Sequence, residues 1–463
     1  MKHRHWLILC CLALLSACSR PHLEIFPPLS NEALLTKKIP VAQLKEDVDA
    51  FIAGVLERHP APERYTEIAA IRAQAEQLKS ALTEPLTRVE FFRQVGQLSH
   101  AFNDGHTFLI WPYQEFTVLK EQGAVAFPFE VQSNPEGLFI KGDYTDGSAR
   151  LAAGTQIMSI NGVSAEHIIE YAQRYVGGET RILREQTVAA RFAPMSWAVF
   201  GVMDAFSMEV LVNGKREVME MERPESWQRQ QTQLQEQTDF YYRKLNDSVG
   251  YLYVGHFDVE PDWFEDFIDD TFAEIKASSV TSLIIDIRDN TGGNTDTVTY
   301  LSRHIANKPF QLVSRVTEKL NHDNRGLFNY RGEVGQLLNE KWDEWETPVD
   351  ESVRFTGDTY LLISPVSYSS AIVFATTLKD NGFATLIGQP TGGFANQTAQ
   401  GNLFNLPHSE LRVYVATKLL VRPSGDTAVQ GVQPHVIIPQ DQKSLASGKD
   451  TGIEAVLTLI NAR

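Results

Sequence analysis

Cysteine is scarce in this chain of 463 residues, which contains only three. Cys10 and Cys11 fall in an N-terminal segment that we expect to be removed, so Cys18 is left alone and no disulfide can form within one mature molecule. The fold must therefore be stabilised by ordinary burial, which a chain of this length with 43% hydrophobic residues can supply. The length itself predicts two or three domains.

Positive charge is also in short supply, because 42 Lys and Arg residues stand against 58 Asp and Glu residues and give a formal net charge of −16. Nucleic acids need a basic protein face to offset their phosphates, so we expect no nucleic-acid partner. Metal-ligand spacing is lacking as well, since the 12 histidines form no His-Glu-x-x-His pattern. We therefore predict neither a metal site nor a cofactor.

Long apolar runs are missing too, and the run from Trp6 to Leu15 is too short to cross a bilayer. It follows a positively charged start and predicts a secretory signal peptide over residues 1–17. The run closes with Leu15-Ser16-Ala17-Cys18, which resembles the lipobox of bacterial lipoproteins. The alternative is a plain signal peptide that a cysteine happens to follow.

The lipobox resemblance implies that Cys18 is lipidated and that the protein sits in the bacterial cell envelope, with the lipid as its only membrane contact. Ser19 follows the cysteine, not Asp, which favours the periplasmic face of the outer membrane. The mixed, proline-containing residues 18–40 read as a tether between the anchor and the folded part.

The remaining chain divides by its hydrophobic pattern. Apolar residues recur at three and four over residues 41–118, which predicts a helical domain. Short alternating runs over residues 119–225 predict a β domain. Within it, Ala153 to Gly162 resembles the strand and Asn-Gly turn of a PDZ domain, although other small β domains use such turns and the stretch from Tyr171 to Met208 is more helical than a compact PDZ domain requires.

Residues 239–440 alternate between strands and helices, and residues 441–463 read as a C-terminal helix. Continuous apolar runs bounded by turns are typical of strands covered on both faces, so we predict an α/β core. The expected strands are 249–254, 283–287, 359–363 and 385–388, and the expected helices are 263–277 and 369–380.

Two places in this core combine a buried strand, a sharp turn and a helix. The first turn contains Gly292 and Gly293, whose amides could face a developing oxyanion. At the second, Ser369 opens a helix, so its hydroxyl could face a cleft while the Ser370 amide helps to hold the oxyanion. Taken alone, such a serine is more often a helix cap.

The order of these segments resembles the tail-specific protease, or C-terminal processing peptidase, family of serine peptidases. The resemblance rests on the strand-to-glycine segment, the nucleophile helix, the loop after it and the final Gly-Val-x-Pro segment, which are residues 282–293, 367–382, 387–393 and 431–435. It implies a crotonase/Clp-like core preceded by a helical domain and a PDZ-like domain. It also implies that Ser369 is the nucleophile and that Gly292 or Gly293, with Ser370, supplies the oxyanion amides.

The sequence departs from the family where the bacterial processing enzymes carry a lysine base, because Phe394 stands in the matching loop. Residues 103–107, Asn-Asp-Gly-His-Thr, resemble instead a motif of the tricorn-core-like branch, whose histidine acts as the base. This implies that His106 serves Ser369, since histidine suits proton transfer near neutral pH. The alternative is a turn histidine with a purely structural role.

The acidic partner of this histidine is not evident, and Asp426 is the nearest acid to the place where the family carries one. His435 replaces the acid of the final segment, and Ile372 replaces a glutamate common after the nucleophile. The resemblance thus predicts a serine endopeptidase that cleaves polypeptides by acyl transfer. The alternatives are an inactive peptide-binding protein of the same fold and a hydrolase of non-peptide esters or amides.

Overall fold

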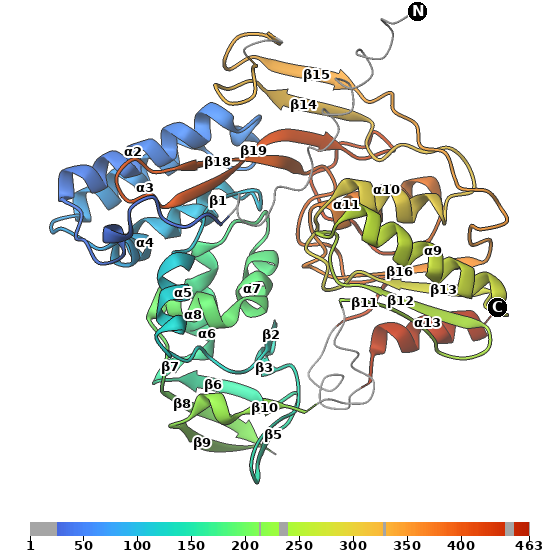
Figure 1. The fold of residues 1–463 in the computed structure, drawn as a ribbon, viewed down its shortest axis with the longest axis horizontal. Helices are drawn as coiled ribbons and strands as arrows, with labels where there is room; N and C mark the ends of the chain where they lie inside the picture. Colours follow the sequence, from blue (N-terminus) through green and yellow to red (C-terminus); the bar gives the residue numbers. More distant parts are fainter. Residues whose placement is uncertain (1–25, 213, 231–238, 327–329, 440–448, 463) are drawn as a thin grey trace, which may run out of the picture.

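A computed structural model describes residues 26–212, 214–230, 239–326, 330–439 and 449–462. The signal peptide, the lipobox with Cys18 and the first part of the tether lie outside these residues. Figure 1 shows the N-terminal helices and the β unit on one side of the molecule and an α/β core on the other, with two long strands, β18 and β19, connecting them.

The first unit is helical, as the periodicity predicts. It contains α2 (Val41–Arg58), α3 (Ile68–Ala81) and α4 (Arg88–Val95), followed by the 3-10 helix η3 (Gly96–Phe102). The apolar face of α2 is fully covered at Val48, Phe51 and Val55. Asn103 ends η3 in the left-handed conformation, and this reversal sends the chain back through His106 into β1 (Thr107–Leu109).

The second unit contains the expected β-sheet, in the order β2-β3-β6-β8-β9 with β7 on β6. The strands are β2 (Val131–Asn134), β3 (Gly137–Ile140), β6 (Gln156–Ile160), β7 (Val163–Ser164), β8 (Phe206–Val212) and β9 (Lys215–Met221). A second, smaller sheet joins β4 (Tyr144–Asp146), β5 (Ala149–Leu151) and β10 (Gln228–Arg229). The tight turn after β6 has positive φ at both Asn161 and Gly162.

Helices α7 (Arg181–Ala190) and α8 (Phe192–Phe200) occupy the stretch that reads as helical in the sequence, and α6 (Ala165–Ala172) lies just before it. One hydrophobic cluster includes both Leu44 in α2 and Met221 in β9, so the first two units share a core across the expected boundary at residue 118. This shared core fixes the β unit against the helical unit, whose last turn leads into His106.

The third unit is the predicted α/β core. Its sheet has the order β11-β12-β13-β16-β17-β20, and all neighbours from β12 onward are parallel. The strands are β11 (Phe240–Lys244), β12 (Val249–Val254), β13 (Ser282–Asp286), β16 (Asp358–Ile363), β17 (Thr385–Gly388) and β20 (Val436–Ile437). Helices α9 (Pro261–Ala277), α10 (Thr295–Arg303) and α11 (Ser370–Asn381) pack with one apolar cluster, and α13 (Thr451–Asn461) packs with another.

A further sheet, which the sequence patterns do not predict, ties the core to the N-terminal unit. It contains β14 (Arg315–Lys319), β15 (Leu337–Lys341), β18 (Thr398–Asn405) and β19 (Arg412–Val421). Strand β1 pairs with β19, with Thr107 opposite Val415. Because His106 directly precedes β1, this pairing fixes the histidine relative to the core.

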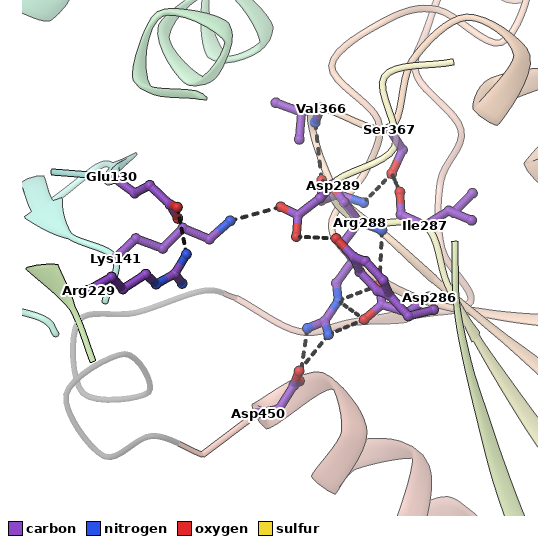
Figure 2. Close-up of polar contacts among 12 residues, drawn as sticks. Glu130, Lys141, Arg229, Asp286, Ile287, Arg288, Asp289, Val366, Ser367 and Asp450 are labelled. Atoms are coloured by element: carbon purple, nitrogen blue, oxygen red, sulfur yellow. Dashed lines mark hydrogen bonds and ion pairs between the residues drawn. The ribbon is translucent and has the colours of Figure 1, made fainter. Parts of the chain in front are cut away.

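Figure 2 shows three charged contacts near the end of β13. Arg288 binds Asp286 at the end of the strand, and its Nη1 lies 2.8 Å from Oδ1 of Asp450 at the start of α13. Lys141 of the β unit reaches Asp289, with an Nζ–Oδ1 distance of 3.2 Å. Arg288 is therefore structural, and Asp289 joins the β unit to the core. Among the described residues, no helix has both the length and the apolar character needed to span a membrane.

Candidate active site

Ser369 occupies a strained turn between β16 and α11. Its φ of 55° and ψ of −122° lie in a region that residues with a side chain rarely adopt, at a cost of about 1–3 kcal/mol. Neighbouring contacts hold the turn in place: the Tyr368 amide donates to the Asn290 carbonyl, and Nε2 of Gln397 donates to the Ser369 carbonyl over 2.7 Å. The side chain makes no capping hydrogen bond to α11, so the hydroxyl is available to another group.

His106 lies directly beside this hydroxyl. Its Nε2 is 2.9 Å from Oγ of Ser369, although the two residues are 263 positions apart in the sequence. His106 is 6% exposed. Burial lowers the pKa of His106 below 6.5, because the charged ring would lose its water, although the Asp104 charge opposes this. A neutral imidazole within hydrogen-bond distance can accept the serine proton.

The other ring nitrogen, Nδ1 of His106, is connected to Asp104 through a hydroxyl. Oγ1 of Thr398, at the start of β18, lies 3.2 Å from Nδ1 and donates to Oδ1 of Asp104 over 2.5 Å. The same carboxylate accepts hydrogen bonds from the His106 amide, from Nε2 of His59 and from Oγ1 of Thr107. Burial alone would raise the pKa of Asp104, but the hydrogen bond and charge of His59 outweigh it and hold the pKa well below its usual range.

A second hydroxyl reaches the same ring nitrogen. The Tyr368 oxygen lies 3.0 Å from Nδ1 of His106 and donates to Oε1 of Glu179 over 3.0 Å. Burial, together with the nearby Asp104 charge, raises the pKa of Glu179 to about 8. Burial also raises the pKa of Tyr368 well above 10, so its hydroxyl stays protonated. His106 thus faces two buried acids, each through one hydroxyl.

The backbone amides near Ser369 match the expected oxyanion site in part. Ser370 is the first residue of α11, so its N–H has no partner within the helix. A Cβ added to Gly292 would lie 2.6 Å from Cβ of Ser369 and 3.1 Å from the Ser370 nitrogen, which places this glycine directly against the nucleophile. The Gly292 amide, however, donates to Oδ1 of Asn290 over 2.9 Å. The bridge that pairs Gly293 with Phe257 uses the Gly292 carbonyl and the Asn294 amide, and does not use the Gly293 amide. Of the two glycines, Gly293 is therefore the better second donor to the oxyanion.

A cavity of about 390 Å³ opens over the two reactive side chains and the Gly292–Gly293 turn. Its apolar walls come from the helical unit, the β unit and the connecting sheet: Phe108, Leu109, Trp111, Val176, Leu183, Met195 and Tyr414. A second hollow of about 220 Å³ lies between β2 and α7 and shares Ala190 and Val366 with the first. The reactive groups therefore line the first hollow, which adjoins the second at Ala190 and Val366.

Asp426 does not hold the position expected of the acidic partner. It is exposed, and its carboxylate accepts from the Ala428 amide in its own loop. The expectation for Asp426 is wrong in this structure, because Asp104 and Glu179 occupy the surroundings of His106 instead. Phe394 packs beside the Tyr65 ring, and Nδ1 of His435 accepts from the Leu386 amide, so both are structural.

Sequence reasoning brought together the nucleophile, the base and two amides but missed the groups behind His106. Asp104 lies only two residues before His106, and it reaches the imidazole ring indirectly, through the hydroxyl of Thr398. Thr398, Tyr368 and Glu179 carry no spacing signature of their own. Within the described residues, no three His, Cys, Asp or Glu side chains gather as they would around a metal ion.

Comparison with known proteins finds similarity in sequence and in fold. The sequence model of peptidase family S41 matches residues 248–438. A curated Chlamydia pneumoniae protein, CPj1016/CpB1054, is 32% identical over 112 residues, which make up 23% of this chain and only 17% of that protein. Two solved structures of mature CPAF, one of them complexed with lactacystin, share the fold at a TM-score of 0.67 and 14% identity. The alignments cover 90% of this chain and 98% and 96% of those chains.

Proposed function

We propose that the chain is a serine endopeptidase of the tail-specific protease family, in which His106 activates Ser369; the match of its core to peptidase family S41 supports this. The observation that carries this proposal is the 2.9 Å distance between Nε2 of His106 and Oγ of Ser369, in a strained turn beside a cavity. An inactive binding protein would have no need to hold the turn in a conformation that costs free energy.

The reaction follows from the placement of the groups. Oγ of Ser369 attacks a peptide carbonyl while its proton passes to Nε2 of His106, and the amides of Ser370 and Gly293 stabilise the oxyanion. The C–N bond then breaks, the leaving amine takes the proton from His106, and an acyl-enzyme forms. Water attacks this ester with His106 again accepting a proton, which releases the acid and regenerates the serine.

The substrate in this proposal is an extended polypeptide. Strand β2 is an edge strand of its sheet, and the hollow beside it, between β2 and α7, is where a peptide could add as a further strand in the manner of a PDZ domain. Since this hollow shares Ala190 and Val366 with the catalytic cavity, such a peptide would continue toward Ser369. The apolar walls of that cavity favour large apolar side chains near the scissile bond.

The location in this proposal is the bacterial cell envelope. Its support is the sequence Leu15-Ser16-Ala17-Cys18 after a short apolar run, which lies outside the described residues. Lipidation of Cys18 would hold the catalytic units close to a membrane surface, because Leu34 and Ile39 of the predicted tether are buried against the folded part.

The proposal is tested by incubating the purified mature chain with an unfolded protein such as reduced casein and identifying the products by mass spectrometry. We expect new termini with the wild type and none with Ser369→Ala. Casein that binds to both proteins and is cut by neither would overturn the proposal in favour of the peptide-binding alternative. Hydrolysis of simple esters without peptide cleavage would point to the non-peptide hydrolase.

A further inference from the structure

Tyr368 is held in a slot that leaves its ring little freedom. A Cβ added to Gly105 would lie 2.4 Å from the Tyr368 hydroxyl oxygen, and one added to Gly393 would lie 2.4 Å from a ring carbon. The Gly-His-Thr and Thr-Gly-Gly segments therefore meet on the two sides of this ring. The ring also lies over His106, with centroids 4.8 Å apart. This confinement holds the Tyr368 hydroxyl at Nδ1 of His106.

A hydroxyl next to a catalytic imidazole can stabilise either the reactive or the unreactive tautomer of the ring. Ser369 needs a proton-free Nε2, so the neutral ring must carry its hydrogen on Nδ1. Nδ1 then needs an acceptor, but a phenol that donated its own hydrogen to Nδ1 would favour the opposite tautomer. A tyrosine hydroxyl has one hydrogen, so the direction in which it donates decides between the two outcomes.

Glu179 decides that direction. It lies between η4 (Gln173–Tyr175) and α7 and is 8% exposed, and its Oε1 receives the Tyr368 hydrogen. With that hydrogen engaged, only lone pairs of the Tyr368 oxygen face Nδ1. Thr398 presents its oxygen in the same way, because Asp104 takes its hydrogen. Resting on the proposed function, we propose that Glu179, acting through Tyr368, is a positioning residue that fixes the tautomer of His106 in which Nε2 can act as the base.

If Glu179 has this role, the effect of replacing it should depend on whether Tyr368 is present. Glu179→Met removes the acceptor, so the freed Tyr368 hydroxyl turns its hydrogen toward Nδ1 and stabilises the unreactive tautomer. Tyr368→Phe removes the competing hydrogen altogether and leaves Thr398 to hold Nδ1. The loss caused by Glu179→Met should therefore be largely reversed when Tyr368→Phe is added, an effect that damaged packing would not produce.

The experiment measures the second-order rate constant for modification of Ser369 by a fluorophosphonate at pH 7. We expect Glu179→Met to lower it about tenfold or more, Tyr368→Phe about threefold or less, and the double variant to match Tyr368→Phe. Tyr144→Phe, whose lost hydroxyl accepts from the Glu130 amide in the β unit, is the matched control and should react like the wild type. An unchanged rate in Glu179→Met, or a double variant as slow as Glu179→Met, would overturn the inference.

A second readout does not depend on activity. Long-range ¹H–¹⁵N spectra of ¹⁵N-histidine protein, with His106 assigned from His106→Gln, report which ring nitrogen carries the hydrogen. We expect Nδ1–H in the wild type and a shift toward Nε2–H in Glu179→Met. If the tautomer shifts but the wild type never reacts with the probe, the peptidase proposal fails and the positioning role stands. If the wild type reacts and the tautomer does not move, the reverse holds.

The pH dependence gives a third readout. The charged and titratable groups that act on Glu179 or share its hydrogen-bond network are Tyr65, Asp104, His106, Arg184 and Tyr368. Above pH 8 the ionised Glu179 can only accept, so it orients the Tyr368 hydroxyl most firmly. The rate for the wild type should therefore rise through pH 8, and this rise should be absent in Tyr368→Phe. A rise that persists in Tyr368→Phe would contradict a role for Glu179 through that hydroxyl.

Discussion

Nδ1 of His106 and Oδ1 of Asp104 are joined through a single hydroxyl, that of Thr398, which lies 3.2 Å from the ring nitrogen and 2.5 Å from the carboxylate oxygen. A direct contact between the carboxylate and the imidazole ring is replaced by a relay through Thr398, which lies in a second segment of the chain. Thr398 belongs to β18, and its partner strand β19 pairs with β1, so the sheet that joins the units also assembles the relay.

Thr398→Val is predicted to break this relay at nearly constant volume. Without the hydroxyl, Nδ1 loses an acceptor and buried Asp104 loses a donor, so kcat should fall about tenfold or more while KM stays within about twofold. Thr398→Ser keeps the hydroxyl and should retain most of the activity. The measurement is steady-state cleavage of a peptide derived from a mapped casein site. Equal activity in the valine and serine variants would show that the hydroxyl is not needed.

Gly292→Ala is predicted to displace the nucleophile, because the new Cβ would lie 2.6 Å from Cβ of Ser369. We expect about a hundredfold loss of kcat/KM, comparable to the loss of an oxyanion donor. Gly382→Ala is the matched control: this glycine also has positive φ, at 72°, but its added Cβ would meet no atom within 4 Å. If both variants lose the same activity, backbone strain and not contact with Ser369 is the cause.

The buried Glu179 should make the folded chain less stable as the pH rises. Its pKa is about 8 in the folded protein against 4.5 for an ordinary glutamate, so between these values the unfolded chain binds fewer protons and stability falls with increasing pH. Glu179→Gln removes this penalty, and its Tm should exceed that of the wild type at pH 8, by about 2 °C or more, with a smaller difference at pH 5. Differential scanning calorimetry at the two values measures this. A constant Tm difference would mean that Glu179 does not titrate in this range.

The proposed lipid anchor predicts a change in location on Cys18→Ser. Without the thiol no lipid can be attached, so the protein should move from the membrane fraction to the soluble periplasmic fraction of a Gram-negative host. Immunoblotting of the two fractions provides the measurement, and Ser19→Ala is the control that keeps the cysteine. Retention of the serine variant in the membrane would argue for another mode of attachment.

The parts of the fold that the sequence predicted are those specified locally. Strands β12, β13, β16 and β17 are continuous apolar runs, and their burial on both faces leaves a clear signature. The sheet formed by β14, β15, β18 and β19 was not predicted, because its pairings depend on distant partners such as β1. The same distinction applies to the core that α2 and β9 share.

The residues of the candidate site can be separated in the same way, into those specified locally and those placed by the fold. Ser369, His106 and the glycine turn stand in recognisable segments, so they could be named from the sequence. Glu179, from the segment before α7, and Thr398, from β18, influence the His106 ring only because the fold brings these distant polar side chains close to it. Asp426 was preferred for its position in the sequence, but the space around Nδ1 of His106 is already filled by two hydroxyls.

The central claim is that His106 makes Ser369 a nucleophile, and the most direct measurement is the site and rate of fluorophosphonate modification, read by peptide mass spectrometry. The account predicts one adduct in the wild type, on Ser369, no adduct in Ser369→Ala, and a rate about a hundredfold lower in His106→Gln. A wild type that stays unmodified, or that reacts equally well without the imidazole, would contradict it.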